Sequence, residues 1–306
     1  MLRNIALPLL LTAACAGGEV DPREGPDAAT PRDAADVALQ QDVPRDLTVA
    51  DAPPADDLPP LPDAPAGDAA VCSGNRDGVI ARNEMAFLLG ASVLYAVNRM
   101  GTTVEPINTA AMAMPSGRVW DFSAPTAQDT RVLDEVLSPR GQWWSSMYAD
   151  ATFATIIDRS TNLLGVYRVS DTALELLATV STEANRTNLR FTPPVAVLRF
   201  PLRVGASWDQ TVNGAGTFNF TPLANTTRYT TVIDSAGEVW TPAGRFPALR
   251  MRTDLDQSIP LTLIRVTRKT YTFIAECWGV IARVTSVDNE TAEELRRASE
   301  YRRLGL

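Results

Sequence analysis

The feature that most limits what this chain can fold into is a long Ala/Asp/Pro-rich segment, residues 16–70. It has no aromatic residue and no hydrophobic period, so it cannot bury enough apolar surface to offset the entropy lost on ordering. Residues 16–71 carry 13 acidic side chains, 3 basic ones and 10 prolines, a net charge of −10. Proline and like charges extend such a chain, so we expect residues 15–70 to be a disordered tether. An acidic docking motif is the alternative, but no specific pattern supports it.

The rest of the chain is nearly neutral and long enough for a buried core, because residues 72–306 carry 24 basic and 23 acidic side chains. No basic stripe of the nucleic-acid-binding kind is expected from such a balance. The chain has no histidine. This absence excludes Ser-His-Asp and Cys-His catalysis and every metal site with a histidine ligand.

Residues 1–14 are typical of a signal peptide. Arg3 precedes an apolar run from Ile5 to Leu11, and small residues follow it up to Cys15. The run is much shorter than the ~20 residues needed to cross a bilayer. We therefore interpret it as a targeting segment and not as a membrane helix.

The end of this segment, Leu11-Thr12-Ala13-Ala14-Cys15, resembles the lipobox of bacterial lipoproteins. It departs from the family pattern at Thr12, where leucine is preferred. The resemblance implies cleavage before Cys15 and attachment of acyl chains such as palmitate to that residue, with the membrane as partner. By analogy with lipoprotein sorting, Ala16 favours the outer membrane. The alternative is an ordinary secretory signal cut near Ala14, with Cys15 incidental.

The residues that begin the folded part, Cys72 to Glu84, resemble a calcium-binding EF-hand loop, with Gly78 at the sharp turn. The resemblance implies these calcium ligands: Ser73, Asn75, Asp77, Val79 (through its carbonyl) and Glu84. The family's aspartate at the first position is replaced by Ser73, and Ala81 offers no ligand at the ninth. Only two carboxylates remain, so any site should be weak. The alternative is an Asn/Asp-Gly turn that needs no metal. Calcium is the one cofactor that the sequence suggests.

The chain has 3 cysteines. If Cys15 carries lipid, Cys72 and Cys277 remain as a pair in an oxidising compartment. A disulfide between them would close a loop of about 200 residues and tie the end of the tether to the last strands. Two buried free thiols are the alternative.

Residues 71–306 contain mostly short β-type runs separated by turn residues. Leu163–Val169 and Ala173–Val180 flank Ser170-Asp171, a hairpin pattern. The other expected strands are Val119–Phe122, Ala206–Val212, Arg228–Ile233, Glu238–Thr241, Phe246–Thr253, Ile259–Thr267, Tyr271–Cys277 and Val280–Ser286. The sequence thus predicts a mainly β fold, an antiparallel curved sheet or barrel-like meander, preceded by the tether.

Three regions allow other interpretations. Residues 291–304 are charge-rich with Leu295, Ala298 and Tyr301 at helical spacing, which predicts a short C-terminal helix whose arginines, Arg302 and Arg303 among them, face solvent. Periodicity cannot decide between helix and strand for residues 85–97. The pair at 143–144, two tryptophans, could be an exposed platform for sugar or lipid, but core or rim packing is favoured.

Several turn signatures follow one order along residues 195–286. They are Phe200-Pro201-Leu202 with Gly205 and Trp208, then Thr241-Pro242-Ala243-Gly244-Arg245-Phe246 with Leu249-Arg250, then Gly279-Val280-Ile281-Ala282-Arg283. Together they resemble the TapB-like family of bacterial envelope domains. The family's late Gly-x-Gly is replaced here by Cys277-Trp278-Gly279. The resemblance implies an antiparallel curved-sheet envelope domain and no established activity.

Three functions agree with these features. The first is a lipid-anchored envelope protein that displays a β-rich binding or structural domain to a protein, glycan or lipid partner. The second is a carrier of a lipid or other hydrophobic ligand in a curved-sheet cavity. The third is an enzyme that uses a pair of carboxylates, for which only Asp121 and Glu276 stand out, beside a tryptophan and a cysteine. No motif marks this pair, so we expect a protein without catalytic activity.

Overall fold

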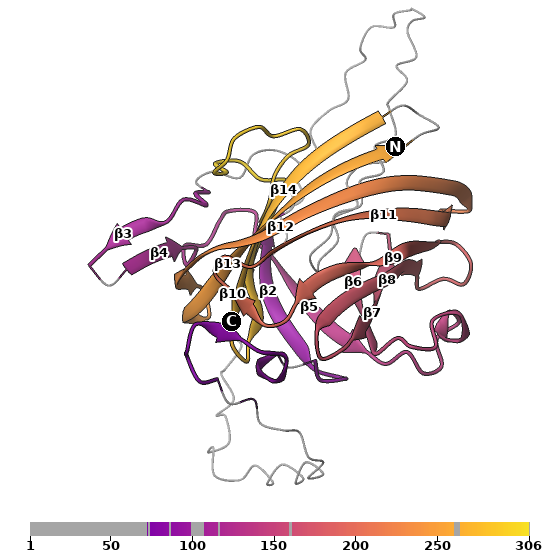
Figure 1. Cartoon of the computed structure of the whole chain (residues 1–306), viewed down its shortest axis with the longest axis horizontal. Coiled ribbons are helices and arrows are strands. Elements are labelled where there is room, and N and C mark those ends of the chain that lie inside the picture. Colours follow the sequence, from indigo (N-terminus) through magenta and orange to yellow (C-terminus); the bar gives the residue numbers. More distant parts are fainter. Residues whose placement is uncertain are drawn as a thin grey trace, which may run out of the picture. The chain divides into compact units, whose positions relative to one another are not determined.

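Antiparallel β-strands make up most of the domain (Figure 1). The computed structural model describes residues 72, 74–85, 87–98, 107–115, 117–158, 161–259 and 264–305. The predicted signal peptide, residues 1–14, and the tether, residues 15–70, lie outside the described residues, as does Ser73. Among the described residues, no helix is long and apolar enough to cross a membrane.

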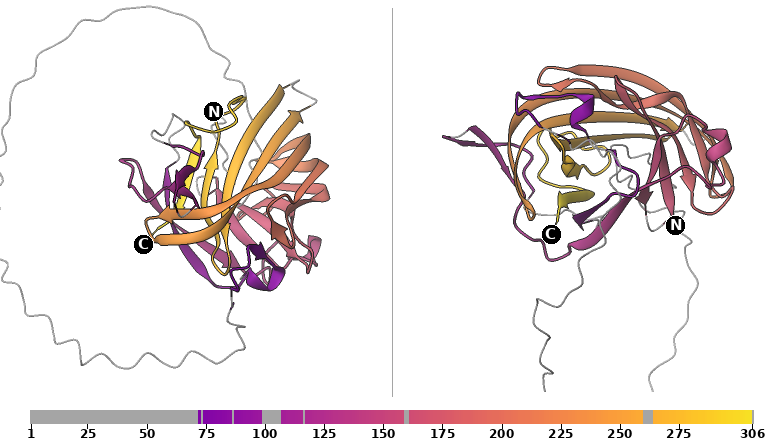
Figure 2. Two further views of the ribbon diagram at one scale, coloured as in Figure 1. Left: turned by 60° about the vertical axis from the view of Figure 1, so that its left-hand side comes forward. Right: turned by 90° about the horizontal axis from the view of Figure 1, so that it is seen from below.

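Twelve strands form a closed ring in which each strand pairs with two neighbours. In chain order they are β2 (Ser92–Asn98), β5 (Thr130–Leu137), β6 (Phe153–Asp158), β7 (Leu163–Val169), β8 (Ala173–Ser181), β9 (Asn188–Arg199), β11 (Ser207–Phe218), β12 (Thr221–Thr241), β13 (Gly244–Ile259), β14 (Ile264–Ala275), β15 (Gly279–Thr285) and β16 (Glu300–Leu304). β11 pairs with both β9 and β12, and this second pairing closes the ring. The predicted mainly β, barrel-like meander is confirmed, and the strands wrap around a common axis in Figure 2.

The described residues form four shorter strands outside this ring: two extend its sheet, and two form a separate two-stranded sheet. β3 (Met112–Met114) and β4 (Gly117–Asp121) form a hairpin that projects from the side of the domain in Figure 1. β4 pairs in parallel with β12 at Glu238–Trp240, beyond the part of β12 that pairs with β11. β1 (Val79–Ile80) pairs with β10 (Leu202–Arg203) and fixes the segment that follows Cys72.

The interior of the ring is packed by an apolar cluster that joins its opposite walls. Tyr167 and Leu176 come from β7 and β8, whereas Met251 and Ile274 come from β13 and β14. Ile80 and Met85 of the N-terminal segment belong to the same cluster. This segment is therefore part of the core and not a loose extension of the tether.

A second apolar cluster contains a group of aromatic side chains in mutual contact. Phe273 of β14 contacts Trp120 and Phe122 edge-on, with ring centroids 5.2 and 5.1 Å apart, and Phe122 contacts Tyr301 at 5.6 Å. Leu295 and Ala298, from the irregular residues before β16, are buried in this cluster too. A third cluster contains Trp144, which is fully buried, while Trp143 is half-buried and donates its indole N–H to the Ser181 carbonyl. The two tryptophans are thus packed against the core and do not form an exposed platform.

The predicted C-terminal helix is wrong. Residues 291–299 are irregular, and Glu300–Leu304 form β16 between β15 and β2. The helical spacing of Leu295, Ala298 and Tyr301 arose because all three are buried in this second cluster, the first two from an irregular segment and Tyr301 from a strand. The prediction that Arg302 and Arg303 face solvent is also wrong, since both are buried.

The strand boundaries show further differences. Residues 228–233 and 238–241, predicted as two strands with a turn between them, belong to the single strand β12, which has a bulge between Ile233 and Ser235. Residues 87–91 form neither helix nor strand, and β2 begins at Ser92. The predicted strand over 259–267 is divided by residues 260–263, which lie outside the described residues. The hairpin of β7 and β8 is confirmed, as are the turn at Pro242-Ala243 and the buried Trp208.

Candidate functional site

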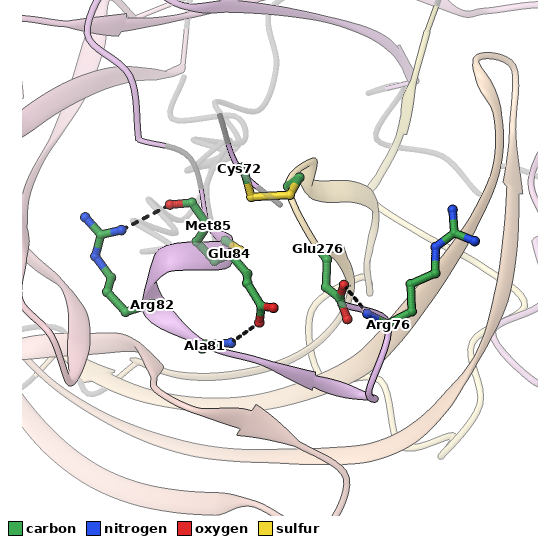
Figure 3. The surroundings of a disulfide bond; sticks show 8 residues. Cys72, Arg76, Ala81, Arg82, Glu84, Met85 and Glu276 are labelled. Carbon is green, nitrogen blue, oxygen red and sulfur yellow. Dashed lines mark hydrogen bonds between the residues drawn. A yellow bond between two sulfur atoms is a disulfide. The ribbon is translucent and has the colours of Figure 1, made fainter. Parts of the chain in front are cut away.

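The predicted partners Cys72 and Cys277 form a disulfide, with their Cα atoms 5.5 Å apart (Figure 3). The bond joins the first described residue to the tight turn between β14 and β15, 205 residues later in the chain. The Cys277 N–H also donates to the Glu84 carbonyl at 2.8 Å. The N-terminal segment is thus held to this turn by a covalent bond and by a hydrogen bond.

The predicted calcium loop forms a turn stabilised by its own side chains. Asn75 Oδ1 accepts the Asp77 N–H at 2.9 Å, and Asp77 Oδ1 accepts the Val79 N–H at 2.8 Å. Asp77 Oδ2 accepts a hydrogen bond from the Asn75 side chain at 3.1 Å. Both carboxylate oxygens of Asp77 therefore have partners without a metal, as in an Asx turn.

Glu84 stabilises the other end of the same segment. It is buried, and its Oε2 accepts the Ala81 N–H at 2.8 Å where the 3-10 helix η2 (Arg82–Glu84) begins. Within the described residues, no group of three or more acidic or cysteine side chains is placed to hold a metal ion. The donor set of the described residues fits a turn better than a preformed calcium site, and calcium binding stays a prediction.

Glu276 connects the turn between β14 and β15 to the segment that crosses it. Its Oε2 accepts the Arg76 N–H at 2.9 Å (Figure 3). A Cβ atom on Gly74 would lie 2.6 Å from the same oxygen, so glycine permits this close approach. Asp121, the other carboxylate considered for catalysis, accepts hydrogen bonds from the Ser123 N–H and hydroxyl at 3.0 and 2.6 Å. Asp121 thus stabilises a local turn, whereas Glu276 holds the N-terminal segment against the turn between β14 and β15.

Two adjacent pockets of about 180 and 330 Å³ lie beside the disulfide and share Arg76, Pro247 and Glu276 in their walls. The larger one is also lined by Arg245, Phe246 and Trp278. We call these six residues the junction groove. They come from the crossing segment, the start of β13 and the turn before β15.

The aromatic wall of the junction groove is held in place but open to solvent. Trp278 is 60% exposed, and its ring contacts Phe246 edge-on with centroids 5.2 Å apart. The guanidinium carbon of Arg245 lies 4.1 Å from the centre of the Trp240 ring. The sequence motifs around Pro242–Phe246 and Cys277–Gly279 were interpreted only as turns, and the fold brings these two turns together.

A cluster of buried charges was missed by the sequence prediction. Arg302 pairs with Asp134, and Arg283 pairs with Glu300. The guanidinium carbon of Arg302 lies 4.9 Å from the centre of the Tyr95 ring. Burial, with Asp134 contributing, raises the pKa of Tyr95 to about 12 although both arginines act to lower it. The alternation of inward and outward side chains along β16 could have predicted this strand. Its inward positions carry charged residues instead of apolar ones, so the pattern was not recognisable.

No family model and no curated protein matches the chain. Two solved structures are similar to the chain at a low level. One is a protein of Bacteroides fragilis NCTC 9343 described as exported, with a YmcC-like fold: it is 13% identical, the match covers 71% of this chain and 94% of that one, and the TM-score is 0.37. The other, from Parabacteroides distasonis ATCC 8503 and described as a lipoprotein, is 7% identical, with 72% and 95% covered and a TM-score of 0.34. These values are too low to carry a statement about function, and the TapB-like resemblance stays an expectation.

Proposed function

We propose that this protein is a lipid-anchored protein of the cell envelope, at the outer membrane, that displays its β-rich domain as a binding or structural module. The observation that carries the proposal is the disulfide between Cys72 and Cys277. Disulfides persist in oxidising compartments outside the cytosol. The pairing leaves Cys15, in the lipobox-like sequence, as the only remaining cysteine of three.

The composition of the tether supports display at a distance from the membrane. An acidic, proline-rich segment of this kind is expected to be extended and semi-rigid. Stable membrane attachment needs more than one acyl chain, and the maturation implied for Cys15 supplies several. The domain would then be held at the end of the tether, with the junction groove beside the attachment point at Cys72.

A binding role agrees better with the described side chains than the carrier and enzyme alternatives. A carrier needs an empty apolar cavity for its ligand. In this domain, side chains from opposite walls of the ring pack together in one apolar cluster, and a second buried region is filled by ion pairs. The two carboxylates considered for catalysis have structural partners: Asp121 stabilises a local turn, and Glu276 holds the N-terminal segment. The junction groove instead offers an exposed aromatic ring beside charged groups, which is typical of a binding site.

The anchor is tested by metabolic labelling with palmitate in a bacterial host that matures lipoproteins. We expect the full chain to incorporate the label and to fractionate with membranes, and Cys15→Ala to lose both properties. Cys72→Ala is the matched control, because it removes a cysteine but leaves the acylation site. Label that persists in Cys15→Ala, or that is absent from the wild-type chain, contradicts the proposal.

A weak calcium site at the start of the domain is a separate part of the proposal. It would use Asn75, Asp77 and Glu84, which must exchange their present hydrogen bonds for metal contacts. Calorimetric titration of the full chain with millimolar calcium, beside Asp77→Ala, tests it. A heat of calcium binding that is present with the wild type and absent with the variant supports the site. If neither protein gives a heat of binding, the loop is a turn that does not bind calcium.

A further inference from the structure

The junction groove contains two guanidinium groups, those of Arg76 and Arg245. Among the described residues, neither Arg76 nor Arg245 takes part in an ion pair. Arg76 is exposed, and in Figure 3 its guanidinium points away from Glu276. Arg245 is held against Trp240. A planar guanidinium that is fixed by stacking and free of an ion pair is well suited to bind a carboxylate.

The other groups of the groove differ in chemistry from these arginines. Trp278 presents an exposed indole face, an apolar surface that is large enough to cover one side of a sugar ring. Glu276 uses Oε2 for the Arg76 N–H, and no described residue donates to its Oε1. This oxygen can accept a hydrogen bond from a ligand hydroxyl. The groove thus combines an aromatic face, cationic donors and an anionic acceptor.

We propose that the junction groove binds an acidic saccharide. A sugar ring lies against Trp278, its carboxylate is bound by Arg76 and Arg245, and a ring hydroxyl donates to Glu276. The proposal rests on the proposed function and deepens it by naming a ligand class. The larger pocket, about 330 Å³, lies near the lower end of the range for ligand sites, ~300–1,000 Å³, and fits a short stretch of glycan.

A saccharide fits the groove better than a polyanion such as a nucleic acid. Residues 72–306 carry 24 basic and 23 acidic side chains, so the domain provides no general attraction for phosphate chains. Glu276 in the wall of the groove would repel a ligand that carries a charge at every unit. A saccharide with one carboxylate and several hydroxyls satisfies both the arginines and the glutamate.

The test uses the full chain with Cys15→Ala, which removes the lipid and makes the result independent of the anchor. Binding of sialyllactose and of an aldobiouronate, each of which carries one carboxylate, is measured by calorimetry and tryptophan fluorescence, with lactose as the neutral counterpart. We expect the acidic ligands to bind at least about tenfold more tightly than lactose, and binding to weaken with salt. Failure of this test would leave the palmitate result, and so the anchor, unaffected.

Variants separate the parts of the site. Trp278→Ala should weaken binding of both acidic ligands by about tenfold or more, and Arg76→Gln with Arg245→Gln should remove the preference over lactose. Phe220→Ala and Arg186→Gln are the matched controls, since Phe220 is 63% exposed and Arg186 is a surface residue outside the groove. Circular dichroism confirms that each variant is folded. The proposal is overturned if neither acidic ligand binds at millimolar concentration, if Trp278→Ala binds as the wild type does, or if an Asp/Glu-rich peptide binds in the groove and the saccharides do not.

Discussion

At the scale of single residues, the burial of Arg283, Arg302 and Arg303 is the property that sequence reasoning least anticipates. All three are almost fully removed from solvent. Taking charges out of water is costly unless they are paired and hydrogen-bonded. Arg303 meets this condition through Asp129 and two backbone carbonyls, at Phe122 and Ala124. For Arg302, burial acts to lower the pKa, and Glu300 and Asp134 together raise it above its usual value.

Removing one charge of this buried cluster should destabilise the domain strongly. In Asp134→Asn, Arg302 loses the closer of its two carboxylate partners and keeps Glu300, whose Oε1 lies 3.6 Å from its Nε, while its side chain stays 1% exposed. Breaking a buried pair in this way costs about 3–5 kcal/mol of unfolding free energy. Denaturant unfolding of the full chain measures the loss. Asp150→Asn is the control: it removes a partner of Arg168 that is 55% exposed, so the change should be below about 1 kcal/mol. Equal effects of the two substitutions would contradict this account.

At the scale of elements, strands could be predicted where turn residues separate apolar runs of strand length. The hairpin of β7 and β8 is of this kind, because Ser170 and Asp171 separate two such runs. β16 could not be found in this way, since its inward positions carry Glu300 and Arg302 and their burial depends on partners in β5 and β15. The junction groove could not be predicted either, because its residues come from segments far apart in the sequence that meet only when the ring closes.

The continuity of β12 was missed because a glycine such as Gly237 is typical of a turn. In the structure Gly237 instead permits a close contact between two backbones. A Cβ atom at this position would lie 2.5 Å from the Arg118 carbonyl oxygen of β4. The close approach allows β4 to pair with β12 where β11 has ended. Glycine is thus needed here for packing between two backbones.

Gly237→Ala should therefore disturb the attachment of β4. The clash is with a backbone atom and cannot be relieved by a side-chain rotation, so we expect a loss of about 1–3 kcal/mol in unfolding free energy. Hydrogen exchange should show the protection of β4 amides falling first. Ala224→Ser, at an exposed position of the same strand, should change stability by less than about 0.5 kcal/mol. An unchanged denaturation midpoint in Gly237→Ala would contradict this prediction, because it would mean that the backbones of β4 and β12 can move apart at no cost in unfolding free energy.

At the scale of the whole molecule, the disulfide links the end of the tether to the closed ring. Between Cys72 and Cys277 lie nearly all the strands, so the bond restricts the unfolded chain over 205 residues. In the chain-entropy model a loop of this length contributes roughly 5 kcal/mol, with native-state effects reducing the measured value. The core does not depend on the bond directly, because Ile80 and Met85 are buried by apolar contacts of their own.

We therefore expect the double variant Cys72→Ser with Cys277→Ser to fold and to lose about 2–5 kcal/mol of unfolding free energy. Its denaturation midpoint should fall, and its native state should keep the β-sheet signal in circular dichroism. Because the hydrogen bond to Glu276 is then the described contact that ties the exposed residues 74–76 to the turn before β15, the Arg76 amide should exchange faster than the amides of β1. Cys15→Ala, which removes the cysteine outside this bond, should leave both properties unchanged. If the double variant unfolds at the wild-type midpoint and Arg76 stays protected, the apolar contacts of the segment alone position the junction groove, and reduction of the disulfide would leave ligand binding intact.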